Sequence, residues 1–127
     1  MIITVFDTSV CTENLGDFVI MDAVREELIQ LFPDAMLLHT TTHDKISRPS
    51  YKLTKKSHFA FVGGTNLLSS NMNRYNQWKV GVKDSLFLSS ILLMGVGWWQ
   101  YQSSPNSYTR FVLNRILHHE IASSSID

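Results

Sequence analysis

The residues best suited to chemistry form two short polar segments, each placed directly after an apolar run. The first contains Asn14, Gly16 and Asp17, and the second, much further along the chain, runs from Gly63 to Asn66. In open parallel α/β sheets, ligands bind in the crevice beyond the carboxyl ends of the strands. The placement of the two segments therefore predicts one ligand-binding mouth, formed by an Asn/Asp loop and a Gly-Gly loop.

The first segment has the composition of a loop that opens a helix at a binding site. Gly16 lets the backbone approach a ligand closely, and the free N–H groups of a helix N-terminus attract negative charge. Asp17 can accept hydroxyl protons from a sugar or act as a base. The same residues fit a simple capping motif, with Asn14 as the cap and Asp17 in the first turn. Taken alone, they leave both roles open.

In the second segment, the glycines can present backbone N–H groups to a phosphate or a sugar. Thr65 and Asn66 add two side-chain donors beside Gly63 and Gly64. No Gly-Lys-Ser/Thr follows, and the spacing differs from the dinucleotide-binding fingerprint, so neither of those phosphate loops is predicted. The alternative interpretation is a tight turn that needs a positive φ.

A third glycine segment, from Gly95 to Gly97, is followed by two tryptophans, Trp98 and Trp99. The glycines can clear space beside a ligand, and a tryptophan can stack on a sugar ring. Paired tryptophans also suit packing against another domain or a second copy of the chain. The residue types alone favour packing.

A basic stretch follows the second predicted strand, with only Asp44 opposing it: Lys45, Arg48, Lys52, Lys55 and Lys56. As a basic flap, it can attract a phosphorylated donor or a nucleotide-linked acceptor. A charge run of this kind is more often a solvated loop.

Other chemistries are disfavoured by the positions of the reactive side chains. His39 and His43 span a strand end and a loop, and the adjacent His118 and His119 cannot face one point, so no metal site is predicted. Cys11 has no activating base beside it in the sequence. A Gly-x-Ser-x-Gly elbow is absent, which disfavours a serine hydrolase.

The composition is typical of one globular domain. The chain has 127 residues, 44% of them hydrophobic and 17% charged, with 11 Lys+Arg and 11 Asp+Glu. A zero net charge argues against nucleic acid as a partner. One cysteine, the lack of a signal-peptide pattern and the lack of an apolar run of about 18 residues predict a cytoplasmic protein without a membrane span.

The elements that must position these residues alternate between strand and helix. Strands are expected at residues 2–6, 35–40, 59–62, 91–96 and 120–124. Helices are expected from Asn14 to Pro33, near residues 82–88, and after Ser104 with Pro105 at the first helical position. The alternation predicts a Rossmann-like, three-layer α/β/α fold with a mostly parallel sheet.

The helical periodicity also predicts which side chains face the core. The first helix is expected to bury Phe18, Met21, Val24, Leu28 and Leu31, and the last one Tyr108, Phe111, Val112 and Ile116. Residues 41–57 are polar and aperiodic, so they are expected to form a long loop. Residues 66–75 are expected to be irregular.

Taken together, these motifs resemble the N-terminal half of the polysaccharide pyruvyl transferase family. The family opens with a strand and an Asn-x-Gly-Asp loop, which here begins at Asn14, and continues with a glycine-rich turn, here at Gly63. A later strand ends in a Gly-x-Gly turn, here from Gly95 to Gly97. Two departures are that Thr65 replaces a third glycine, and that residues 125–127 lack the arginine of the family's Arg-Asp.

The resemblance implies a transferase of exopolysaccharide biosynthesis. Such an enzyme moves a pyruvyl group from phosphoenolpyruvate, the donor substrate, to a hydroxyl pair of a saccharide or nucleotide-linked sugar, leaving a ketal and phosphate. No cofactor is implied. Asp17 becomes the candidate catalytic residue. The candidate substrate-binding residues are Asn14, Gly16, Gly63, Gly64, Thr65, Asn66, Gly95 and Gly97.

The family also implies a second half that faces this one in a two-domain, GT-B-like arrangement. Residues 1–127 are then a single Rossmann-like domain that forms one wall of the interdomain site, and the chain alone is expected to be weak or inactive. The opposite wall is expected to be a C-terminal domain or a homodimer mate. Two alternatives remain: a non-catalytic sugar- or phosphate-binding or dimerisation module, and half of a nucleotide-sugar glycosyltransferase.

Overall fold

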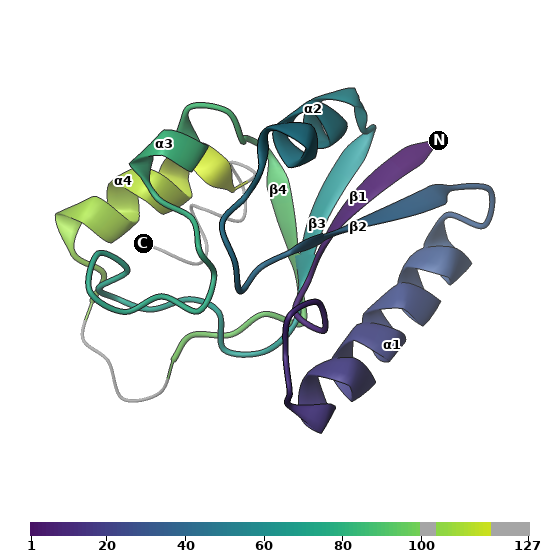
Figure 1. The fold of residues 1–127 in the computed structure, drawn as a ribbon, viewed down its shortest axis with the longest axis horizontal. Helices are drawn as coiled ribbons and strands as arrows, with labels where there is room; N and C mark the ends of the chain where they lie inside the picture. Colours follow the sequence, from purple (N-terminus) through teal and green to yellow (C-terminus); the bar gives the residue numbers. More distant parts are fainter. Residues whose placement is uncertain (100–103, 118–127) are drawn as a thin grey trace.

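The computed structural model describes residues 1–99 and 104–117 (Figure 1). Within these residues, one all-parallel sheet contains β1 (Ile2–Asp7), β2 (Met36–Thr41), β3 (Phe59–Gly63) and β4 (Ile91–Met94), in the order β2-β1-β3-β4. The helices are α1 (Leu15–Leu31), α2 (Arg48–Lys56), α3 (Val82–Ser85) and α4 (Ser107–Ile116). The predicted parallel α/β fold is confirmed, while the strand predicted at 120–124 lies outside the described residues.

Helices cover both faces of the sheet, because alternate residues of a strand point to opposite sides. One cluster joins β1 and β3 to α1: Ile3, Val5, Met21, Val24, Leu28 and Phe61. The other joins the opposite face to α4 and to the segment between β3 and α3, with Phe6, Val62, Trp78 and Ile91 among its members. Figure 1 shows α1 on one side of the sheet and α2, α3 and α4 on the other.

Helix α1 buries a shorter stripe than its periodicity predicted. Met21, Val24 and Leu28 are buried, but Phe18 is 44% exposed and Leu31 is 56% exposed. A 17-residue helix is about 26 Å long, whereas a six-residue strand spans about 20 Å. Phe18 lies off the buried stripe of Asp17, Met21, Val24 and Leu28, whereas Leu31 is the last residue of the helix and lies beyond the end of that stripe.

The long loop predicted for residues 41–57 is wrong, because it contains α2. The Ser47 side chain caps this helix by accepting from Ser50 N–H, and Pro49 lies in its first turn. The helix buries no residue fully and is tied to β2 by a hydroxyl pair, Ser50 with Thr40 at 2.8 Å. Because α2 has no apolar stripe, helical periodicity does not reveal it. The sequence signal for its start is the Ser47 cap followed by Pro49.

Helix α4 begins later than predicted. Its cap is Asn106, whose Oδ1 accepts from Thr109 N–H at 2.8 Å, so the prediction that Ser104 is the cap is wrong. The buried face comprises Thr109, Val112, Leu113 and Ile116, which follow an i, i+3, i+4, i+7 pattern. Phe111 was expected in the core but is 49% exposed, because it lies off this stripe.

The segment between β3 and α3 is irregular, as predicted, but it is packed into the core. Leu67, Leu68 and Met72 are buried. Met72 N–H donates to the Thr109 hydroxyl at 3.0 Å, and this hydroxyl donates to Ser70 O at 3.2 Å, so the segment is anchored on α4. None of the described helices combines the length and apolar character that a bilayer crossing requires.

Candidate functional site

The carboxyl edge of the sheet brings the predicted glycine segments together. In the register of the sheet, Gly63 lies between Asp7 of β1 and Met94 of β4. The chain leaves β1 toward β2 on one side and leaves β3 toward β4 on the other. The gap between β1 and β3 is therefore the topological switch point, where open parallel sheets bind ligands.

The last residue of β1, Asp7, is a buried carboxylate that sequence reasoning missed. Its Oδ1 accepts from the Ser9 N–H at 2.7 Å and from the Ser9 hydroxyl at 2.5 Å, and its Oδ2 accepts from His39 Nδ1 at 2.6 Å. Burial alone raises the pKa of this carboxyl, but the hydrogen bonds from His39 and Ser9 outweigh burial and hold the pKa below its usual value. A usable signal was the acidic residue that ends an otherwise apolar strand.

Thr8 fills the space beside Gly64 at the switch point. Gly64 has a φ of +146°, and a Cβ added there would lie 2.2 Å from Thr8 Cγ2. This confirms the predicted turn with positive φ. Thr8 is fully buried, and its hydroxyl has no hydrogen-bond partner among the residues that the structure describes.

At two other glycines, the missing side chain lets a neighbouring part of the chain approach closely. A Cβ on Gly63 would lie 3.0 Å from Val24 Cγ1, so this glycine admits α1 to the sheet. Gly97 lies against Asn66, whose Oδ1 would be 2.8 Å from a Cβ added to Gly97. Gly97 N–H also donates to Thr65 O at 3.2 Å. The structure thus joins Thr65, Asn66 and Gly97, and it places Gly63 at the helix–sheet contact. Gly95 has a φ of +67° and more room around it.

The Asn/Asp loop makes local hydrogen bonds. Asn14 Oδ1 accepts from Gly16 N–H at 2.9 Å, which confirms the predicted N-cap. Asp17 is 4% exposed, and its Oδ2 accepts from the Thr12 hydroxyl at 2.6 Å. Both polar side chains are therefore occupied in the first turn of α1.

The two tryptophans have different environments. Trp98 is partly buried against the core and is bridged to Leu68. Trp99 is 41% exposed and lies 5.4 Å from the ring of Tyr75, which is 42% exposed. Gln77 Nε2 donates to the Tyr75 hydroxyl at 3.2 Å. Trp98 thus packs on the core of its own domain, whereas Trp99 and Tyr75 form an accessible aromatic pair beside the glycine segment.

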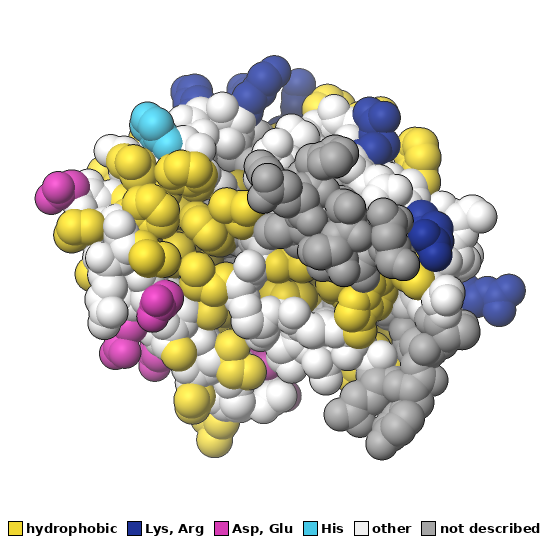
Figure 2. Space-filling model, turned by 180° about the vertical axis from the view of Figure 1, so that it is seen from behind, with side chains coloured by type: hydrophobic (Ala, Val, Ile, Leu, Met, Phe, Trp, Pro, Cys, Tyr) yellow, Lys and Arg dark blue, Asp and Glu magenta, His cyan; other side chains and the backbone are white. Residues whose placement is uncertain are grey.

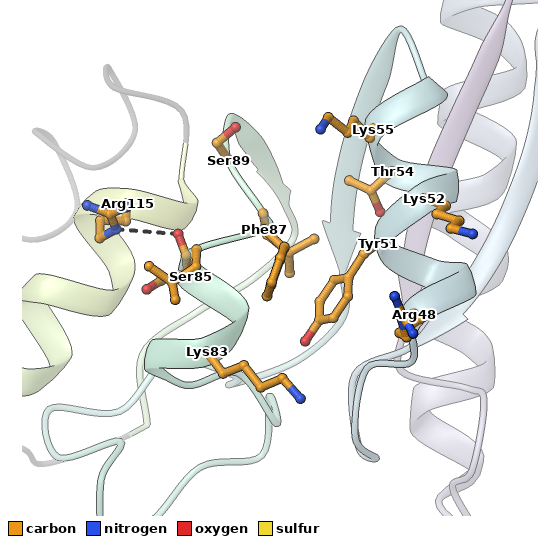
Figure 3. A pocket seen from close by; sticks show the side chains of 12 residues that line it. Arg48, Tyr51, Lys52, Thr54, Lys55, Lys83, Ser85, Phe87, Ser89 and Arg115 are labelled. Carbon is orange, nitrogen blue, oxygen red and sulfur yellow. Dashed lines mark hydrogen bonds between the residues drawn. The ribbon is translucent and has the colours of Figure 1, made fainter.

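A larger hollow lies away from the carboxyl edge, between α2 and the α3–α4 pair (Figure 3). The basic stretch, which was interpreted as a solvated loop with a basic flap as the alternative, is divided by this arrangement. Arg48, Lys52 and Lys55 line the hollow, whereas Lys45 and Lys56 do not. The basic residues are thus carried mainly by a helix wall rather than by a loop.

Within the described parts of the chain, no three His, Cys, Asp or Glu side chains are grouped so that they can hold a metal ion. Cys11 is exposed and has a φ of +63°. No protein-family model matches the chain, and neither a curated protein nor a solved structure gives a match. Function must therefore be argued from the motifs and their arrangement.

Proposed function

We propose that this chain forms one wall of a polysaccharide pyruvyl transferase-like site. The reaction joins the pyruvyl group of phosphoenolpyruvate to two sugar hydroxyls as a ketal and releases phosphate. One observation carries the proposal: Thr65, Asn66 and Gly97 lie together beyond the carboxyl ends of β3 and β4, beside the switch point. Thr65 and Gly97, two residues of the motif resemblance, thus follow strands at the edge where such sheets bind ligands.

The aromatic pair supports a sugar as the acceptor. A sugar ring has an apolar C–H face, which gains stability when it is removed from water against an aromatic ring. Trp99 and Tyr75 present exposed rings, and Asn66 supplies an amide for hydrogen bonds to hydroxyl groups. Sites of this kind combine apolar contact with a few placed polar groups.

Asp17 remains the proposed acceptor of a sugar hydroxyl proton. Its carboxylate is almost fully buried and is engaged by Thr12, so the sugar reaches it only when the segment between β1 and α1 moves. Protonation of the enol carbon and neutralisation of the leaving phosphate are assigned to the opposite wall.

A second candidate, a non-catalytic binding or dimerisation module, is favoured by a separate observation. Figure 2 shows hydrophobic side chains gathered on one face of the molecule. The exposed apolar residues of the chain include Val19, Met36 and Phe59, with exposed fractions of 70%, 60% and 40%. Extended exposed apolar surface marks sites of association.

The test is phosphoenolpyruvate-dependent phosphate release with a panel of free and nucleotide-linked sugars. It is run on this chain and on any longer product of the same reading frame. We expect release by the longer form and little or none by this chain. Release by neither form contradicts pyruvyl transfer and favours the binding module. Binding of a nucleotide-linked sugar without phosphoenolpyruvate favours a glycosyltransferase half.

A pair of variants locates the acceptor site in the active form. Trp99→Ala is expected to raise the KM for the sugar by about ten-fold, because a stacked ring contributes about 1 kcal/mol or more. Phe111→Ala is the matched control, since Phe111 is 49% exposed on α4 and lies off the carboxyl edge. An equal effect of both variants contradicts the placement of the sugar.

A further inference from the structure

The hollow between α2 and the α3–α4 pair is a groove of about 1040 Å³. Helix α2 forms one wall, α3 and the residues after it form the other, and Arg115 of α4 contributes to the lining (Figure 3). None of the residues that carry the proposed pyruvyl transfer lines it. Its volume is at the upper end of the range for small-molecule sites, about 300–1,000 Å³, and is much larger than an inorganic anion needs.

The groove carries a concentration of positive charge in a chain whose net charge is zero. Five cationic side chains line it: Arg48, Lys52, Lys55, Lys83 and Arg115. The three on α2 are spaced i, i+4, i+7, which places them on one side of the helix. No ion pair to any of the five occurs among the described residues. The cations therefore lie on both walls of the groove, and none has a direct ion-pair partner in the described part of the chain.

One carboxylate, that of Asp84, lies beside the groove, and no ion pair joins it to any of the five cations among the described residues. Asp84 accepts from the Tyr51 hydroxyl with one oxygen and from Gly81 N–H at 2.8 Å with the other. Arg115 Nε donates to Ser85 O at 3.3 Å, which holds this side chain on the α3 side of the groove. An anion entering the groove would therefore meet an excess of positive charge, because five cationic side chains line it and Asp84 is the one carboxylate described beside it.

The middle of the groove is aromatic. Tyr51 and Phe87 are stacked, with ring centroids 5.0 Å apart and an interplanar angle of 29°. Figure 3 shows the two rings facing each other, with Lys55 and Lys83 reaching in from opposite walls. Phe87 is 56% exposed, so part of its ring remains open to a ligand.

We propose that this groove binds a phosphorylated ligand that carries a planar ring, of which a mononucleotide is the simplest example. The ring stacks on Phe87, and the phosphates lie among the lysine and arginine side chains of the two walls. Aromatic side chains can stack on any nucleobase, because every base has a flat π-face. Lys and Arg bind phosphate through charge-assisted hydrogen bonds. The site is distinct from the carboxyl edge and goes beyond the proposed pyruvyl transfer.

The first experiment is titration of the full chain with ADP, followed by calorimetry and backbone amide NMR. We expect saturable binding, with the largest amide shifts at Phe87, Ser89 and the α2 residues. Adenosine and inorganic phosphate are each expected to bind at least about ten-fold more weakly than ADP, since each retains only part of the contact. Phosphate binding as tightly as ADP would overturn the role of the ring.

Charge-reversal pairs test the location. Lys55→Glu with Lys83→Glu is expected to weaken ADP binding by about ten-fold or more. The matched control is Lys45→Glu with Lys56→Glu, which makes the same charge change on exposed side chains outside the groove and is expected to weaken binding by less than about two-fold. Equal weakening by both pairs would mean general attraction and would overturn the site. All four lysines are exposed, so the variants are expected to fold.

Two further variants separate this site from the proposed function. Phe87→Ala is expected to weaken ADP binding several-fold, whereas Asn66→Ala at the carboxyl edge leaves it unchanged. Loss of ADP binding with Asn66→Ala alone would move the nucleotide to the carboxyl edge and overturn the groove. A single-stranded oligonucleotide that displaces ADP at a far lower concentration would overturn a small-molecule ligand.

Discussion

The carboxyl edge of the sheet and the groove beside α2 are built in opposite ways. At the edge, glycines allow side chains and backbone to approach closely, and most polar groups are hydrogen-bonded: Asp7 to Ser9 and His39, and Asp17 to Thr12. In the groove, five cations lie around the stacked rings of Tyr51 and Phe87, and none of them forms an ion pair among the described residues. The carboxyl edge therefore depends on close packing, whereas the groove depends on charge. Substitutions at the edge should mainly affect stability, and substitutions in the groove should mainly affect ligand binding.

The largest expected effect is at Gly64. Gly64→Ala is expected to destabilise the protein by about 3 kcal/mol or more, since a positive φ and a clash with Thr8 Cγ2 act together. Gly95→Ala is the matched control. Gly95 also has a positive φ, but its nearest contact is 3.8 Å away, so only about 1–2 kcal/mol is expected. Urea unfolding measures both. Similar losses would mean that Thr8 adjusts freely and that the edge is not closely fitted.

Asp7→Asn is expected to cause the next largest loss of stability. Replacing the carboxylate weakens its hydrogen bonds to His39 and Ser9, and an expected loss of about 2 kcal/mol follows from charged hydrogen bonds at a buried site. Asp34→Asn, at an exposed turn position, is the control and is expected to change stability by less than about 0.5 kcal/mol. The measurement is chemical unfolding at neutral pH.

The same carboxyl predicts a pH dependence. The pKa of Asp7 in the folded protein lies below the ordinary 3.8, so the folded state holds the proton less strongly than the unfolded chain. Its contribution to stability is therefore complete above pH 3.8 and is lost as the pH falls through the lower, folded pKa. In Asp7→Asn this part of the acid dependence should disappear. An unchanged acid limb would show that other groups control it.

Tyr51→Phe is expected to have a smaller effect, about 1 kcal/mol, by removing the hydrogen bond to Asp84. Burial and the neighbouring Asp84 raise the pKa of Tyr51 to about 12 from 10.0. The folded state therefore retains this proton longer, and the contribution is complete below pH 10.0 and is lost as the pH rises toward 12. An ultraviolet titration should show a late-titrating component that Tyr51→Phe removes.

Removing charge from the groove should have the smallest effect on stability. Lys55→Gln with Lys83→Gln is expected to change the free energy of unfolding by less than about 0.5 kcal/mol, in the stabilising direction, because repulsion is relieved. The gain should shrink at high salt. Lys45→Gln with Lys56→Gln provides the comparison outside the groove. A large loss of stability would mean that these lysines hold the fold together and are not free for an anion.

The strands were predictable because buried parallel strands are continuous apolar runs, and the cap at Asn14 was predictable because capping is local. Helix α2 was missed because it buries no residue fully, so it lacks the periodic signal that identifies packed helices. Leu31 has the right spacing for the core, but whether a helix end overlies a strand depends on the relative lengths of the two elements. Phe18 was misassigned because the polar Asp17 occupies the buried position in the first turn.

The groove and the Asp7–His39 pair were beyond sequence reasoning for another reason. Val5 pairs with His39 in the register of β1 and β2, and this register brings the imidazole within reach of Asp7. The stacking of Tyr51 on Phe87 likewise requires α2 and the end of α3 to meet in space. A single sequence gives no local signal for such tertiary contacts, because each residue also has a common interpretation within its own segment.

The central position of β1 has a consequence for how the chain folds. Ile3 pairs with both Leu37 and Phe59, so β1 is synthesised before both of the strands that it needs beside it. The backbone donors and acceptors on the β3 side of β1 stay without sheet partners until β3 has left the ribosome. Topologies dominated by such distant pairings fold more slowly than helical proteins of similar size. Until then, an apolar strand is open to other chains, so synthesis rate and chaperone access should influence the yield of this protein.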